Sequence, residues 1–120
     1  MVEDFDSMEQ LEGLMHDGGT AILDFWSTTC GPCRHMAPHF EAVAEQFASE
    51  PVRFVRINTG SAPELAAPFR IRSVPTLLFV HDGEILDVRV GALSGAALQK
   101  KARWLLRKAS GEGLLARFFG

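Results

Sequence analysis

The stretch from Thr20 to Trp26 most constrains how this chain can fold. It is an almost unbroken apolar run, with one charged residue, Asp24, between Leu23 and Phe25. A strand that is apolar on both sides must be covered on both faces, as in a sheet with helices above and below it. The sequence therefore predicts a buried strand over residues 20–26, at the centre of an α/β domain.

The other elements follow from hydrophobic periodicity and turn signals. Asp6 and Ser7, with Glu9 and Gln10 in capping-box positions, open a first helix that ends at Gly18-Gly19. Further helices are predicted from the cysteine pair to about residue 49, over 62–69 and over 93–108, and further strands over 52–57, 76–80 and 85–90.

This order of elements predicts a mixed sheet. The first two strands flank a helix and should be parallel, with a right-handed crossover. The last two should form an antiparallel hairpin, because Asp82-Gly83 suits a type I′ turn. We expect a mixed central β-sheet flanked by helices on both faces, in one domain over residues 1–109 with a C-terminal extension over 110–120.

Composition and charge narrow the function classes. The 120 residues are 47% hydrophobic and 22% charged, and the net charge is −3. A mildly acidic chain argues against general binding of nucleic acid and of anionic membranes. The N-terminus has no signal-like apolar run, and no stretch approaches ~20 consecutive apolar residues. We expect a cytoplasmic protein.

The chemistry of the chain lies in its two cysteines, Cys30 and Cys33. The pair closes almost no loop, so it is a poor stabilising crosslink and indicates redox chemistry or metal binding. A cysteine at a helix N-terminus meets unpaired N–H groups and the positive end of the helix dipole, which favour the nucleophilic thiolate. Cys30 should be the exposed attacker, and Cys33, one turn into the helix, the shielded resolving thiol.

Half of a zinc site is the alternative interpretation of this pair. Zinc usually takes four ligands, and the nearest further candidates are His35 and His39. Both would have to reach back to Cys30 from the same helix. Two solvated histidines, and no metal, are the favoured interpretation.

Three segments together resemble the thioredoxin family. The segment from Asp24 to Arg34, which contains Cys30-Gly31-Pro32-Cys33, is similar to the family's active-site segment. Ser73-Val74-Pro75-Thr76 resembles its cis-proline loop, and Gly83-Glu84 with Val90-Gly91-Ala92 resembles its hairpin and following turn. The resemblance covers about residues 6–108. It implies the thioredoxin fold, with an N-terminal strand that is short or absent because only about five residues precede the first helix.

The resemblance also assigns residues around the sulfurs. It implies that Asp24 is the buried acid below the cysteine pair, where burial raises a carboxyl pKa and makes it a usable proton acceptor for Cys33. An outward-facing acid is the alternative. Arg56 stands where the family often has lysine, and its permanent charge could hold Asp24 ionised.

The remaining site residues surround the pair. Gly31 and Pro32 separate the two cysteines, with Pro32 in the first helical turn, and Trp26 should flank the site. A cis Val74–Pro75 bond would place the Val74 backbone beside Cys30 to pair with an extended substrate. Gly91 and Ala92 would complete a small apolar rim.

The predicted function is reduction of protein disulfides by a reversible Cys30–Cys33 dithiol, with no further cofactor. Its partners would be disulfide-containing proteins and a thioredoxin reductase-type electron donor. A redox-sensing adaptor without general turnover is the alternative, favoured by Thr29, where the family commonly has tryptophan, and by the C-terminal extension. An oxidase is a weaker alternative, because Gly31-Pro32 resembles the reducing members.

The C-terminal extension has an apolar face of its own. Ser110 to Gly113 interrupt the preceding helix, and four large apolar residues follow: Leu114, Leu115, Phe118 and Phe119. We expect this segment to pack against its own domain in a monomeric protein. An interface with a partner or a second copy, and a disordered end, are the alternatives.

Overall fold

The predicted central strand is the middle strand of a five-stranded sheet in the computed structural model, which describes residues 1–111. β2 (Thr20–Trp26) lies between β3 (Arg53–Asn58) and β4 (Thr76–His81), and β1 (Val2–Phe5) and β5 (Glu84–Val90) form the edges. β2 and β3 are parallel, and β4 pairs antiparallel with both β2 and β5. The predicted mixed sheet is confirmed, and β2 is its central strand.

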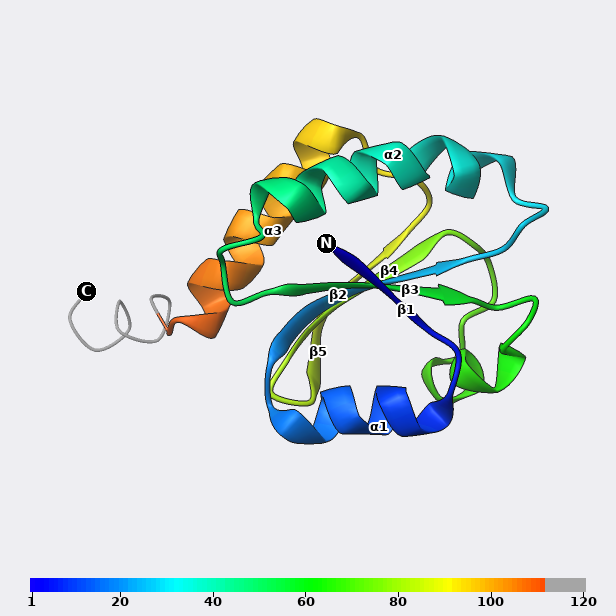
Figure 1. Cartoon of the computed structure of the whole chain (residues 1–120), viewed down its shortest axis with the longest axis horizontal. Helices are drawn as coiled ribbons and strands as arrows, with labels where there is room; N and C mark the ends of the chain where they lie inside the picture. Colours follow the sequence, from blue (N-terminus) through cyan, green and yellow to red (C-terminus); the bar gives the residue numbers. More distant parts are fainter. Residues whose placement is uncertain (112–120) are drawn as a thin grey trace.

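Helices cover both faces of this sheet (Figure 1). α1 (Met8–Asp17) lies on one face, and α2 (Gly31–Gln46) and α3 (Gly95–Ala109) lie on the other. Alternate residues of β2, β3 and β4 therefore belong to two different core layers. Among residues 1–111, no helix has the length and apolar character that a membrane span requires.

The predicted helix over residues 62–69 is instead two short 3₁₀ turns. These are η1 (Pro63–Leu65) and η2 (Ala67–Phe69), which both have a proline in their first turn. Proline lacks an N–H group and restricts the residue before it, so two prolines in eight residues interrupt a continuous α-helix. Leu65 is nonetheless fully buried and anchors this segment to the core layer under α1.

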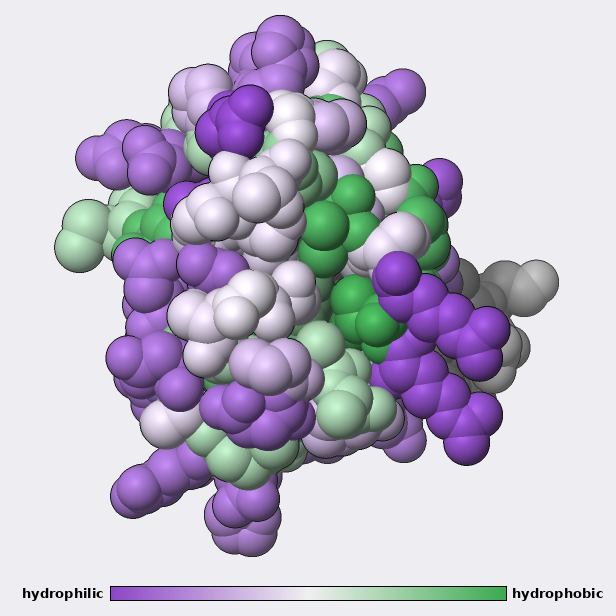
Figure 2. Space-filling model, turned by 90° about the vertical axis from the view of Figure 1, so that its right-hand side faces the viewer, coloured by the Kyte–Doolittle hydropathy of each residue, from purple (hydrophilic) through white to green (hydrophobic). Residues whose placement is uncertain are grey.

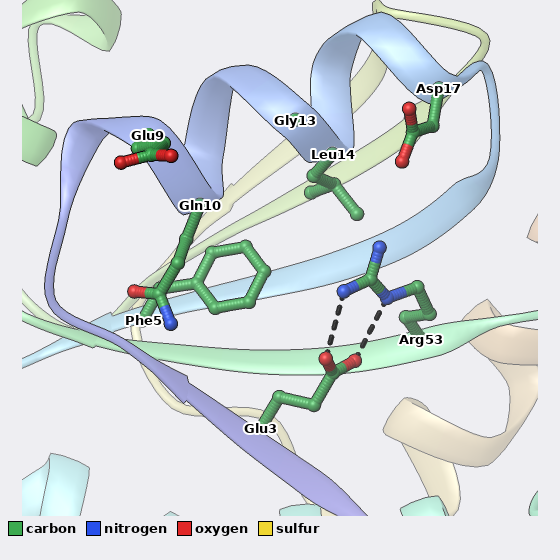
Figure 3. Close-up of a pocket in the computed structure, with 8 residues that line it drawn as sticks. All are labelled: Glu3, Phe5, Glu9, Gln10, Gly13, Leu14, Asp17 and Arg53. Carbon is green, nitrogen blue, oxygen red and sulfur yellow. Dashed lines mark hydrogen bonds and ion pairs between the residues drawn. The ribbon is translucent and has the colours of Figure 1, made fainter.

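The N-terminal strand is short rather than absent. The predicted order of elements begins with a helix and therefore omits β1, which pairs in parallel with β3. Arg53 donates two hydrogen bonds of 2.8 Å to Glu3, and its guanidinium lies 5.6 Å from the ring centre of Phe5. These contacts lie in a hollow between β1 and α1 (Figure 3). Four residues thus suffice for a strand at this edge.

Turn chemistry fixes the element boundaries as predicted. Ser7 and Gln10 form the capping box at the start of α1, and Gly18 ends this helix in the left-handed conformation, with φ 78°. Asp82 and Gly83 have φ values of 54° and 77°, which the two central positions of a type I′ turn require. α3 begins at the cap residue Ser94 and ends before Ser110. The extension predicted beyond Gly111 lies outside the described residues.

Candidate active site

The two cysteines lie where β2 passes into α2. Cys30 is the N-cap residue of α2, with an extended backbone, and Pro32 lies in the first turn. Cys30 and Cys33 form a disulfide, with their Cα atoms 5.3 Å apart. The Cys33 side chain is completely buried, whereas Cys30 is half-buried. The predicted contrast between an accessible and a shielded sulfur is therefore present.

The helix start provides a polar environment for the outer sulfur. The backbone N–H of Cys33 donates to Cys30 Sγ at 3.1 Å, as the side chain of an N-cap residue normally accepts from the third helical position. The free N–H groups of a helix N-terminus carry partial positive charge. These groups stabilise negative charge on Cys30 Sγ.

Asp24 is buried on the face of the sheet that α2 covers. Its side chain has no exposed surface. It lies on the same face of β2 as Ile22, two residues earlier, which packs in the core layer of α2 and α3. Within residues 1–111, neither of its carboxylate oxygens accepts a hydrogen bond. Burial raises the pKa of Asp24 from its ordinary 3.8 to about 6, and the positive charge of Arg56 opposes this rise only in part. An outward-facing Asp24 is thus excluded.

Arg56 is the positively charged residue that pairs with Asp24 across the sheet. The two residues lie opposite each other in the parallel β2–β3 pair, and Arg56 Nε is 3.6 Å from Asp24 Oδ2, longer than a hydrogen bond. The guanidinium carbon of Arg56 lies 4.1 Å from the ring centre of Trp26, in cation–π contact. Arg56 lowers the pKa of Asp24, as a permanent positive charge should, but desolvation has the larger effect and the pKa of Asp24 stays raised.

The cis-proline loop approaches the outer sulfur. The Val74–Pro75 peptide bond is cis, and the Val74 carbonyl oxygen lies 3.5 Å from Cys30 Sγ, although 44 residues separate them in sequence. The Thr76 hydroxyl donates to the Ser73 carbonyl at 2.7 Å, and the Gly91 N–H donates to the Pro75 carbonyl at 2.8 Å. These bonds hold the cis-proline loop against the start of β4 and the end of β5.

The end of the molecule that carries this loop combines apolar and polar side chains. Figure 2 views the protein from this end and shows apolar side chains in a band bordered by charged ones. A hollow of about 150 Å³ lies beside the cis-proline loop. The residues that line it are Thr59, Ile71, Arg72, Ser73 and Val74. Ala92 is exposed after Gly91, and its contact with Cys30 stays a prediction.

Sequence reasoning missed the residue that secures the active-site loop. Arg34 Nη1 donates to the Thr28 carbonyl at 2.7 Å and so connects the first turn of α2 with the loop before Cys30. A cation in the first turn of a helix opposes the helix dipole. That position was the available signal, because such a residue needs a local acceptor to compensate.

The zinc alternative has no support in the described part of the chain. His35 and His39 are exposed on α2, with ring centres 5.9 Å apart. Over residues 1–111, no three His, Cys, Asp or Glu side chains are grouped so that they could hold a metal ion.

Comparison with known proteins identifies the family. A family model described as Thioredoxin matches residues 5–103. The chain is 41% identical over 78 residues to a thioredoxin of Porphyra purpurea, a match that covers 65% of this chain and 72% of the relative. It is 33% identical over 92 residues to a thioredoxin of Coprinus comatus, covering 77% and 87% of the two chains.

Solved structures agree with this match. The crystal structure of thioredoxin from Trypanosoma brucei brucei superposes with a TM-score of 0.80 at 25% identity, covering 89% of this chain and 92% of that one. A chloroplastic thioredoxin z superposes with a TM-score of 0.75 at 31% identity, covering 87% and 93%. With its cysteine pair at the start of α2 and its cis proline beside it, this chain belongs to the thioredoxin family of thiol–disulfide oxidoreductases.

Proposed function

We propose that this protein reduces disulfides of other proteins, with Cys30 as the nucleophile and Cys33 as the resolving thiol. The arrangement of the pair carries the proposal. Cys30 Sγ is half-buried, accepts the Cys33 N–H at the helix start and lies beside the Val74 carbonyl, whereas Cys33 is completely buried. Only the outer sulfur can meet the disulfide of a second protein.

The first step is attack by the Cys30 thiolate on one sulfur of the substrate disulfide. A bond forms between Cys30 Sγ and that sulfur, the substrate S–S bond breaks, and the second substrate sulfur leaves as a thiolate that takes a proton. The N–H groups at the start of α2 stabilise the attacking charge. The product of this step is a mixed disulfide between the two proteins.

The second step releases the substrate. Cys33 loses its proton and attacks Cys30 Sγ, so that the Cys30–Cys33 disulfide forms and the first substrate sulfur leaves as a thiol. Asp24 lies below α2 and its pKa of about 6 suits it to accept the Cys33 proton near neutral pH. Two electrons pass from the dithiol to the substrate over the two steps.

The cis-proline loop supplies the docking site for the substrate backbone. Beside Cys30, the Val74 main chain can pair with an extended segment as an added strand does. Pro75, Gly91 and Ala92 are the proposed apolar border of this site, and Trp26, in cation–π contact with Arg56, is proposed to flank it. Gly31 and Pro32 shape the turn between the two sulfurs.

Thioredoxins need no cofactor beyond this disulfide and are reduced again by a reductase. A thioredoxin reductase-type donor is the proposed electron source here. The monomeric state and the cytoplasmic location stay predictions.

Single substitutions of the two cysteines test the assignment. With a peptide that contains one disulfide, Cys33→Ser should attack but stall as a covalent adduct on Cys30, because no resolving thiol remains. Cys30→Ser should form no adduct and show no turnover. Mass spectrometry of acid-quenched samples distinguishes these outcomes, and turnover by Cys30→Ser would refute the assignment.

Turnover by the unaltered protein tests the alternative, a redox-sensing adaptor. Thr29 favours that alternative, because it is exposed beside Cys30 and offers little contact area. Repeated reduction of the peptide with a small dithiol as the electron source excludes the adaptor, whereas a single turnover without recycling favours it.

A further inference from the structure

Charge is unevenly distributed along this chain. Residues 88–111 contain six Lys or Arg residues and no Asp or Glu, although the net charge of the whole chain is −3. Residues 1–17 contain six Asp or Glu residues and no Lys or Arg. The basic residues lie on β5 and α3, and the acidic ones lie on β1, on α1 and, for Asp6, between them; β1 and β5 are the two edges of the sheet.

The cations of α3 form a stripe on the helix surface. Lys100, Arg103 and Arg107 follow at i, i+3 and i+7, a spacing that places side chains on one face. Like charges at these spacings destabilise a helix. The helix dipole explains Arg107 and Lys108, which lie in the last turn, but it gives no reason for Lys100 and Arg103 in the middle.

This stripe borders a groove of about 500 Å³ between α3 and β5. Lys101 forms its floor, with Nζ 2.6 Å from Asp87 Oδ2, 3.6 Å from the ring centre of Trp104 and 4.8 Å from that of Phe79. The residues that line the groove are Arg89, Lys100, Lys101, Arg103, Trp104 and Arg107.

One carboxylate already binds two of the residues that line this groove. Asp87 accepts hydrogen bonds from Lys101 at 2.6 Å and from Arg89 at 3.0 Å, and these cations lower the pKa of Asp87 to about 2. In the part of the chain that the structure describes, no carboxylate forms a salt bridge with Lys100, Arg103 or Arg107. The groove therefore binds one carboxylate internally and presents three further cations to solvent.

The groove approaches the active-site end of the molecule through Arg89, and its other lining residues lie on α3. Arg89, with a side chain that is 52% exposed, precedes by two residues Gly91, which is bonded to the cis-proline loop. From there the basic stripe follows α3 away from Cys30. A substrate bound along Val74 would have to continue past Arg89 to reach the cations of α3.

We propose that this groove binds an acidic segment of the protein whose disulfide Cys30 attacks. The proposal rests on the proposed function and names its preferred substrates, which carry Asp or Glu near the reactive disulfide. The carboxylate of Asp87 beside the groove favours carboxylates as the ligand, and Arg103 and Arg107 supply planar donor pairs that match them. The net negative charge of the whole chain disfavours long polyanions such as nucleic acid.

Three synthetic peptides test this preference. They share one disulfide and differ only in a neighbouring run of glutamates, glutamines or lysines. At an ionic strength of about 0.01 M, where charges interact over roughly 30 Å, kcat/KM should be at least ~10-fold higher for the glutamate peptide than for the glutamine peptide. At about 1 M salt the difference should disappear.

The double variant Arg103→Gln/Arg107→Gln should lose most of the glutamate advantage and reduce the glutamine peptide at the normal rate. The matched control is Ala42→Glu/Ser49→Glu, which changes the net charge equally at exposed positions outside the groove and should keep the advantage. Equal rates for the three peptides, or an advantage that survives in the groove variant, would overturn the proposal. If the glutamine peptide itself is not reduced, the proposed function fails instead.

Three binding measurements separate other ligands from an acidic protein segment. Vesicles that contain phosphatidylserine, a single-stranded oligonucleotide and the protein itself are tested at the same low ionic strength. Weak or absent binding to all three supports the proposal. Binding to any of them that exceeds binding of the glutamate peptide, and that the groove variant loses, would overturn it.

Discussion

Asp24 is a carboxylate in a place where a negative charge lowers stability. Its pKa rises from 3.8 to about 6 on folding, because burial disfavours the charged form. A folded-state pKa above the unfolded one means that the folded protein binds the proton more tightly. The contribution of Asp24 to stability is therefore complete below pH 3.8 and is lost as the pH rises through about 6.

Asp24→Asn should remove this pH dependence. The difference between the two pKa values corresponds to a free energy on the order of 3 kcal/mol at most. Relative to the variant, the unaltered protein should become less stable by up to this amount between pH 4 and pH 8. The loss is roughly 1.4 kcal/mol for each unit by which the two pKa values differ. Urea unfolding at a series of pH values measures the difference.

Glu64→Gln, which removes an exposed carboxylate from η1, is the control for this series. The same Asp24→Asn protein should release the mixed disulfide more slowly while its first attack on substrate is little affected. If the stabilities of Asp24→Asn and of the unaltered protein changed with pH in parallel, and if release of the mixed disulfide were unchanged, the role of Asp24 would be contradicted.

Thr29 is a residue at which this chain differs from the common family pattern. Its small side chain is exposed before Cys30, so it reduces contact area without altering the helix start that activates the sulfur. We expect slow recycling by a generic thioredoxin reductase, beside normal reduction by small dithiols. Thr29→Trp should accelerate recycling through its larger apolar contact. Efficient recycling of the unaltered protein would show that the difference is neutral.

At this scale the sequence predicts residue identities better than it predicts electrostatic balance. Cys30, Cys33 and Asp24 are recognisable because each is chemically unusual at its position. The net effect of Arg56 is not, because it depends on a distance of 3.6 Å and on the complete burial of its partner. Neither quantity follows from a pattern of residue types.

At the scale of elements, the β4–β5 hairpin shows how one turn fixes a strand register. Gly83 has φ 77°, and a Cβ atom placed on it would lie 2.8 Å from the Met15 carbonyl oxygen at the end of α1. Gly83→Ala should therefore destabilise the protein by at least about 1–2 kcal/mol, the usual cost of the left-handed conformation, with the steric clash added. Thermal or urea unfolding measures this loss.

Gly19→Ala is the matched control, because a Cβ atom there meets no other atom within 4 Å. Equal stability of the two variants would show that the turn does not require glycine.

Element boundaries were predictable where a cap or turn residue marks them. Ser7, Gly18 and the Asp82-Gly83 turn each mark a boundary by their own backbone preference. The short β1 was not fully predictable, because its stability comes from pairing with β3 and from the Glu3–Arg53 ion pair. Contacts over 50 residues leave no local signal in the sequence.

At the scale of the whole molecule, the approach of Val74 to Cys30 depends on the complete fold. Between Cys30 and Val74 the chain forms α2, β3 and the two 3₁₀ turns. No local spacing in the sequence therefore relates these two residues. The family resemblance predicted this approach, and the structure confirms it. A periodicity argument alone would have left the substrate side of the site undefined.

The C-terminal segment gives a prediction at this scale. Deletion of residues 112–120 removes this segment and keeps Ser110 and Gly111, which follow α3. If the apolar side chains of this segment pack on their own domain, the deletion should lower the melting temperature and leave the protein monomeric. Unchanged stability with loss of an association seen by light scattering would instead assign the segment to an interface.

The direction of electron flow is the central claim, and equilibrium with glutathione buffers tests it most directly. The fraction of Cys30–Cys33 disulfide is measured by alkylation after acid quenching, over a range of buffer ratios. The account predicts a reduction potential near the value of about −270 mV that is typical of thioredoxins, so that the dithiol gives electrons to protein disulfides. A potential near about −120 mV, in the range of strong oxidants, would contradict it.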